Sequence, residues 1–317
     1  MNKMLDARIK FRHLQTFVEV ARQKSVIKAA GLLNISQPAV TKTIRELEDA
    51  LGVAVFERDG RGIRITRYGE VFLRHAGAAL SALRQGLDSV SQERSGEAPP
   101  IRIGALPTVS TRIMPRAMEL FLREETWSRI KIVTGENAVL LEQLRIGDLD
   151  LVVGRLASPE NMAGFSFEHL YSEQVVFAVR AGHPLLSAKQ SLFSDLSRYT
   201  LLMPTRGSII RPIVESFLIA NGAGGLPNQI ETVSDSFGRA FVRASDAIWI
   251  ISAGVVAGDV DDGLLALLPI DTSETKGPVG LTVRTDAIPT LPLSILMQTI
   301  REAANEVVES AQKGRPT

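Results

Sequence analysis

Apolar residues recur every three or four positions through most of the first 92 residues, which is the spacing of helices that bury one face. This periodicity predicts three short helices followed by one long helix. Their expected ranges are residues 11–24, a segment that follows Ser25, residues 36–51 and residues 67–92. The order predicts a small helical head and a long connecting helix.

The ends of the short helices carry recognisable signals. Ser25 and Ser36 have hydroxyls suited to capping the second and third helices, and Gly52 is suited to ending the third. Ile27, Ala30 and Leu33 are expected to point inward from the second helix. Two short helices that meet at a tight turn, at residues 34 and 35, are typical of a helix-turn-helix.

Residues 55–66 predict a two-stranded wing after the third helix. Phe56 can anchor it to the core, and residues 59–62 read Asp-Gly-Arg-Gly, which is turn chemistry. Arginines surround this turn. A winged helix-turn-helix reads DNA with the exposed face and N-terminal end of its third helix. The candidate DNA-binding residues are Ser36, Gln37, Pro38, Ala39, Thr41, Lys42 and Arg45 on that helix and Arg58, Arg61 and Arg64 on the wing.

The long connecting helix has an apolar seam. Phe72, Ala76, Ala79, Leu83, Leu87 and Val90 recur in steps of three or four. The seam could pack on the chain's own body, but its length favours pairing with a second copy. Such a dimer would present two heads to two half-sites of DNA. The charged segment that follows, with Pro99 and Pro100 at its end, predicts a hinge.

Beyond residue 100, short β-like runs alternate with helical patterns, which predicts an α/β domain with mainly parallel sheets. The alternation occurs twice, so we expect two Rossmann-like lobes joined by crossing strands, with a ligand cleft between them. The predicted domains are a head at 1–67, a dimerisation helix at 68–92, a hinge at 93–99 and an effector domain at 100–317. Lobe I of the effector domain is expected at about 100–169 and 270–317, and lobe II at about 170–269.

Polar residues recur where the predicted strands of the body lead into helices. Hydroxyls and free backbone N–H groups at such positions favour an anion, and arginine can grip a carboxylate with two hydrogen bonds. The candidate effector-binding residues are Thr108, Ser110, Asn137, Arg155, Arg206, Ser208 and Ser234.

Charge and composition agree with this division. Residues 1–67 hold 13 Lys and Arg against 7 Asp and Glu, whereas the rest of the chain is net negative. A basic head suits contact with phosphates. Cysteine is absent, which excludes disulfides and fits a cytoplasmic location. No secretion signal or membrane span is expected, and the sequence indicates no metal site or cofactor.

The head resembles the LysR-type transcriptional regulators. The matching positions include Ala29-Ala30, Ser36 to Thr41, Leu51-Gly52 and Phe56-Glu57-Arg58. The resemblance continues through Gly104 to Pro115, Leu140 to Leu151 and His183-Pro184-Leu185. It implies a winged head, a dimerising helix, a periplasmic-binding-protein-like effector domain of type 2, and assembly as a homotetramer. Operator DNA, a small anionic effector and RNA polymerase are the partners that it implies.

Five further stretches resemble one subfamily, the regulators of protocatechuate catabolism and their relatives that regulate sugar-binding proteins. They are residues 10–17, 104–110, 133–141, 231–237 and 275–281. This resemblance implies an activator that responds to a β-carboxymuconate-type polycarboxylate. One segment departs from the family, since Val242 to Ile248 lacks the glycines that are common there.

Three alternatives stay open at this point. The first is a regulator of sugar uptake with a sugar effector. The second is an enzyme with its active site between the lobes, although the chain has no nucleophile elbow, P-loop or HExxH motif. The third is a DNA-binding architectural protein without an effector, which saturable binding of a small anion would exclude.

Overall fold

The computed structural model describes residues 8–60, 62–95, 98–124, 128–187 and 192–313. The chain divides into two compact units. The head unit comprises residues 1–99 with 142–149, and the body unit comprises residues 100–141 with 150–317.

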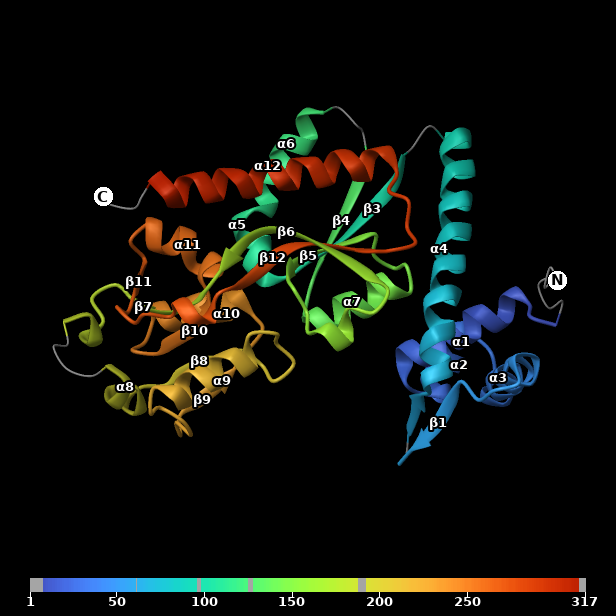
Figure 1. The fold of residues 1–317 in the computed structure, drawn as a ribbon, viewed down its shortest axis with the longest axis horizontal. Helices are drawn as coiled ribbons and strands as arrows, with labels where there is room; N and C mark the ends of the chain where they lie inside the picture. The colour runs from blue at the N-terminus through green and yellow to red at the C-terminus, as the bar shows by residue number, and fades with distance from the viewer. Residues whose placement is uncertain (1–7, 61, 96–97, 125–127, 188–191, 314–317) are drawn as a thin grey trace. The chain divides into compact units, whose positions relative to one another are not determined.

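The head unit is a three-helix bundle with a hairpin and a long final helix (Figure 1). Its elements are α1 (Phe11–Gln23), α2 (Val26–Leu33), α3 (Gln37–Leu51), β1 (Phe56–Asp59), β2 (Gly62–Ile65) and α4 (Arg67–Ser95). The Ser25 hydroxyl accepts a hydrogen bond from the N–H of Lys28, and the Ser36 hydroxyl accepts one from Ala39. Gly52 ends α3 with a φ of 73°. The predicted helix ends are therefore confirmed.

Phe17 lies at the centre of the head core. It is fully buried, and its ring lies 5.3 Å from that of Phe56 and 5.2 Å from that of Phe72. The wing is thus anchored through Phe56, as predicted. The inward orientation predicted for Ile27 is wrong, because its side chain is 68% exposed and Ala29 is buried in its place. In a helix of two turns, the choice of buried face depends on where α1 and α3 cross it.

The apolar seam of α4 changes its surroundings along the helix. Phe72 and Ala76 pack in the head core, whereas Leu83, Leu87 and Val90 are 46%, 63% and 61% exposed. The helix continues through Ser95, beyond its expected end, and the next strand begins at Ala98. The segment expected as a hinge is therefore mostly regular structure, and its residues 96–97 lie outside the described ranges.

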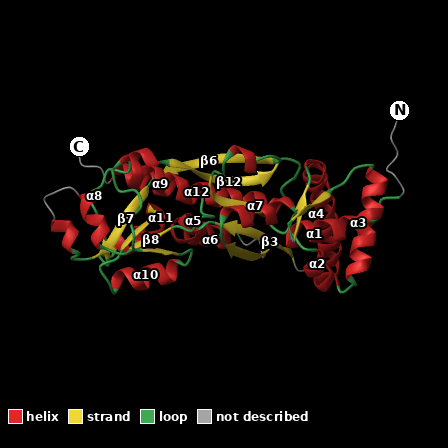
Figure 2. Cartoon of the chain, turned by 90° about the horizontal axis from the view of Figure 1, so that it is seen from below, coloured by secondary structure: helices red, strands yellow, loops and turns green. Residues whose placement is uncertain are grey.

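Lobe I of the body unit has a five-stranded sheet in the order β4-β3-β5-β12-β6. Its strands are β3 (Ala98–Ala105), β4 (Ser128–Thr134), β5 (Leu151–Arg155), β6 (Phe165–Glu173) and β12 (Gly277–Arg284). Figure 2 shows β6 and β12 side by side. The lobe's helices are α5 (Pro107–Arg112), α6 (Met114–Arg123), α7 (Asn137–Arg145) and α12 (Leu291–Lys313). Apolar residues of α5, α6 and α12 pack together with those of the central strands to form the core of the lobe.

Lobe II has a second five-stranded sheet in the order β11-β7-β10-β8-β9. Its strands are β7 (Val175–Arg180), β8 (Leu201–Met203), β9 (Gln229–Glu231), β10 (Ile248–Ser252) and β11 (Leu265–Leu267). Its helices are α8 (Leu192–Asp195), α9 (Arg211–Ala220), α10 (Asp235–Arg243) and α11 (Ala253–Asp261). The chain passes between the lobes twice, from β6 to β7 and from β11 to β12.

Both sheets are mixed rather than mainly parallel. In lobe I, β12 runs antiparallel to β5 and β6, and in lobe II, β7 runs antiparallel to β10 and β11. The helical segment that follows β3 is divided at Ile113 into α5 and α6. Among the described residues, no helix combines the length and apolar character needed to cross a membrane.

Candidate functional site

The outer face of α3 is a shallow, polar surface at the end of the head. Gln37, Pro38, Lys42 and Arg45 are exposed there, and Thr41 is half-buried with its hydroxyl donating to the carbonyl of Gln37. Because Pro38 occupies the first turn and Ser36 caps it, the N-terminal end of α3 is fixed for contact with another surface. The predicted reading residues therefore share one face, with Ala39 half-buried beside them.

Arg45 is the most available cation of this face. Lys42 lies 3.9 Å from Glu46, whereas Arg45 forms no ion pair with any described residue. Hydrogen bonds from His13 and Arg12 to Glu46 lower the pKa of that carboxyl. The hydrogen-bond partners of Glu46 are therefore Arg12 and His13 of α1. The Arg45 guanidinium can contact a phosphate or a base edge.

The three wing arginines differ in their surroundings. Arg58 is exposed, while Arg64 donates two hydrogen bonds to Oε1 of Glu57, at 2.9 and 2.6 Å. Arg61 lies outside the described residues. An exposed pair of this kind contributes little to stability, so Arg64 can exchange Glu57 for a phosphate at small cost.

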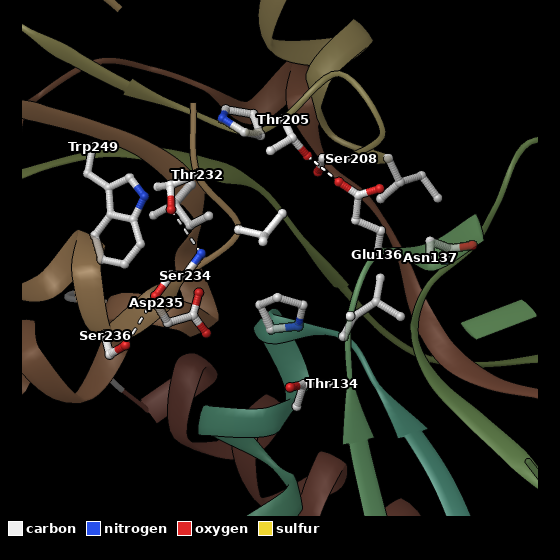
Figure 3. A pocket seen from close by; sticks show the side chains of 17 residues that line it. Thr134, Glu136, Asn137, Thr205, Ser208, Thr232, Ser234, Asp235, Ser236 and Trp249 are labelled. Carbon is white, nitrogen blue, oxygen red and sulfur yellow. Dashed lines mark hydrogen bonds between the residues drawn. The ribbon is translucent and has the colours of Figure 1, made fainter. Parts of the chain in front are cut away.

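A pocket of about 370 Å³ lies between the two lobes of the body unit (Figure 3). Trp249 forms one apolar wall, and Leu106 and Pro107 contribute from the start of α5. Hydroxyl side chains dominate the polar part of the lining: Thr134, Thr205, Ser208, Thr232, Ser234 and Ser236. The first residues of α7 and α10 also face the pocket, and helix starts carry unpaired N–H groups and a positive dipole end.

Three of the seven predicted effector residues line this pocket, namely Asn137, Ser208 and Ser234. Asn137 is buried and donates to the carbonyl of Arg155 at 3.0 Å, and Ser234 caps α10 by accepting from the N–H of Phe237. Both side chains are therefore engaged within the protein. Ser208 has the hydroxyl most available to a ligand among the three.

The other four predicted residues lie outside the pocket lining. Ser110 bonds to the carbonyls of Ala105 and Leu106, and Arg206 is 89% exposed with Nε 3.9 Å from Glu231. Arg155 is buried, and its Nη2 donates to the carbonyls of Glu173 and Thr275. The segment Val242 to Ile248 also lies outside the lining, with Val242 and Ile248 in cores.

Thr108 is held by a buried carboxyl. Its hydroxyl donates to Oε2 of Glu173, and the Arg112 guanidinium lies 3.6 Å from Oε1 of the same group. Burial raises the pKa of Glu173 to about 7, although Arg112, Gly254 and Arg155 lower it in part. Thr108 therefore bonds to the carboxyl at the end of β6 and does not line the pocket.

Sequence reasoning missed the two acids of the pocket, Glu136 and Asp235. None of the described residues that line the pocket carries a cationic side chain. Burial raises the pKa of Asp235, with a partial opposing effect from Arg239. The predicted set consisted of hydroxyls, an amide and arginines, which bind an anion, and an acid does not belong to such a set. The positions of the two acids, next to Asn137 and Ser234 at the same helix starts, were the available signal.

Two family models match the chain. The model described as bacterial regulatory helix-turn-helix protein, lysR family, matches residues 11–70, and the model of the LysR substrate binding domain matches residues 94–305. The regulator named PcaQ from Agrobacterium fabrum is 72% identical over 98% of this chain and 100% of its own length.

Solved structures show the same fold. A full-length single-residue variant of OxyR from Pseudomonas aeruginosa aligns with a TM-score of 0.58 at 21% identity, over 94% of this chain and 95% of its own. Full-length CbnR, solved with its target DNA, aligns with a TM-score of 0.53 at 23% identity, over 93% of this chain and 100% of its own. The fold class predicted from the sequence is confirmed.

Proposed function

This chain belongs to the LysR family of bacterial transcriptional regulators, and we propose that it controls genes of protocatechuate catabolism in response to a small polycarboxylate. It is a DNA-binding regulator and not an enzyme. The 72% identity to PcaQ supports the protocatechuate assignment over the alternative of sugar-uptake control. The observation that carries the DNA-binding part is the exposed α3 face with Arg45, which forms no ion pair with any residue that the structure describes.

The interlobe pocket is the proposed effector site. Hydroxyl groups and two helix starts provide hydrogen-bond donors for carboxylates. Burial raises the pKa of Asp235, the acid at the start of α10. The pocket volume of about 370 Å³ lies at the lower end of the range of small-molecule sites.

The proposed assembly is a dimer through the exposed seam of α4, and a tetramer built from two such dimers. A dimer matches two heads to two operator half-sites. Contact with RNA polymerase would convert operator binding into activation. We also propose a cytoplasmic location, because the protein acts on operator DNA.

Gln37→Ala and Arg45→Ala are expected to weaken operator binding while leaving the fold intact, because both side chains are exposed on α3. Each should cost about 1–3 kcal/mol, and loss of a phosphate contact at Arg45 should also reduce the salt slope of binding by about one. Gel-shift titration at several salt concentrations measures both quantities. Lys131→Ala, which removes an exposed cation from the body unit, is the charge-matched control and should bind normally. Wild-type affinity in both α3 variants would contradict the assignment.

Isothermal calorimetry of the full chain with β-carboxymuconate tests the effector. We expect saturable binding that Ser208→Ala weakens by about two- to tenfold, the usual net value of one hydrogen bond. Arg206→Ala is the control, because this neighbouring side chain lies outside the pocket lining. Absence of binding, or equal loss in both variants, would refute the proposed site.

A further inference from the structure

Glu136 reaches across the interlobe pocket from one lobe to the other. It precedes α7 in lobe I, and its Oε1 accepts a hydrogen bond of 2.6 Å from the Thr205 hydroxyl, which follows β8 in lobe II. Figure 3 shows this bond inside the pocket, with Ser208 beside it. A carboxylate of the protein itself is therefore bound by the opposite lobe.

The turn that receives this carboxylate is shaped around it. A Cβ atom added to Gly207 would overlap the carboxyl group of Glu136, so the missing side chain leaves the space that the carboxylate occupies. The carboxylate is held at a small site, called the seat below, which consists of Thr205, Gly207 and Ser208. Thr205 donates a hydrogen bond from its hydroxyl, Gly207 leaves space because it has no side chain, and Ser208 provides a second hydroxyl nearby. The seat fits a carboxylate without a cationic side chain.

Asp235, the other acid of the pocket, is placed differently. It opens α10 within lobe II, and the nearest cation that acts on it is Arg239 of the same helix. No described residue of lobe I forms a hydrogen bond or ion pair with its side chain. The contact that joins the lobes through the pocket is specific to Glu136.

We propose that Glu136 is an internal stand-in for a carboxylate of the effector. It occupies the seat at Thr205 in this structure, and the effector displaces it by taking the same hydroxyl and the same space beside Gly207. This inference rests on the proposed function, because it assumes a carboxylate effector in the interlobe pocket.

Displacement lowers the observed affinity, since the effector must first break the bond between Glu136 and Thr205. A hydrogen bond to a charged group contributes about 1.5–3 kcal/mol, so removal of the competitor should tighten binding roughly tenfold or more. The same displacement breaks the hydrogen bond between Glu136 of lobe I and Thr205 of lobe II. Effector binding is thereby coupled to movement of one lobe relative to the other.

Calorimetry of the full chain with β-carboxymuconate tests the proposal in a double-variant cycle. Glu136→Ala should bind roughly tenfold more tightly than wild type, and Glu136→Gln, which keeps the side-chain size, should bind more tightly in the same direction. Thr205→Val should change wild-type affinity little, because it removes the bond of the competitor and that of the effector together. In the Glu136→Ala background, Thr205→Val should weaken binding, because only the bond of the effector remains.

Simple charge repulsion predicts a different result, namely that Thr205→Val has the same effect in both backgrounds. That result, or unchanged affinity in Glu136→Ala and Glu136→Gln, would overturn the inference while leaving the effector site in place. If β-carboxymuconate binds neither wild type nor the variants, the proposed effector is wrong and the inference is overturned with it. Tryptophan fluorescence, to which Trp127 and Trp249 both contribute, checks that each variant is folded.

Discussion

The double variant Leu83→Glu/Leu87→Glu is expected to be a monomer in solution and to lose about 100-fold or more in operator affinity. Both leucines are exposed on α4, at 46% and 63%, and follow the stretch where the helix packs into the head core. Burial of apolar surface would drive pairing of two such seams, and a buried carboxylate at each position opposes it. Loss of the dimer removes the effective concentration that lets the second head bind after the first.

The matched control for the seam is Ala82→Glu/Gly86→Glu. These positions lie on the same turns of α4 and are also exposed, and the control adds the same two charges. It should remain dimeric and bind the operator. Analytical ultracentrifugation measures the oligomeric state of both variants, and gel-shift titration measures their operator affinity. A dimeric Leu83→Glu/Leu87→Glu protein would show that the copies pair through another surface.

Local chemistry made the head predictable. Ser25, Ser36 and Gly52 act on the backbone within three or four residues of themselves, so their roles follow from sequence alone. The orientation of Ile27 does not follow in this way. It depends on tertiary packing, and α2 is too short for its periodicity to define one face.

Crossing strands between the lobes were predicted, but the sequence did not locate β12, because its composition argues against a strand. β12 contains Gly277, Pro278 and Gly280, which are all unfavourable in a sheet interior. The structure explains Gly280, since a Cβ there would overlap the backbone carbonyl of Glu168 on β6. The requirement comes from a neighbour more than 100 residues away, and no local pattern records it.

The same omission explains the effector residues. The sequence places Thr108 at a helix start, where a free hydroxyl would favour an anion, but β6 ends in Glu173 and brings a carboxyl to that hydroxyl. Without β6 in the prediction, Thr108 appeared unpartnered. Asn137, Ser208 and Ser234 line the pocket, and each lies shortly after the end of a strand.

Phe17→Ala is expected to unfold the head while the body unit stays folded. Phe17 is fully buried against Phe56 and Phe72, and truncation of a core phenylalanine costs about 3–5 kcal/mol. That loss is a large part of the stability of a small domain, which is about 5–15 kcal/mol. The body unit has its own cores, so operator binding should disappear while effector binding persists.

The distribution of tryptophan allows the two units to be followed separately. The chain has two tryptophans, Trp127 and Trp249, and residues 1–99 contain none. In urea titration of Phe17→Ala, far-ultraviolet circular dichroism should show an early transition that tryptophan fluorescence does not report. Phe11→Ala, a truncation of a 48% exposed ring on the same helix, should leave both transitions where the wild type has them. If the fluorescence transition of Phe17→Ala shifts in parallel, head and body unfold as one cooperative unit. The prediction that this variant loses operator binding and keeps effector binding would then be wrong.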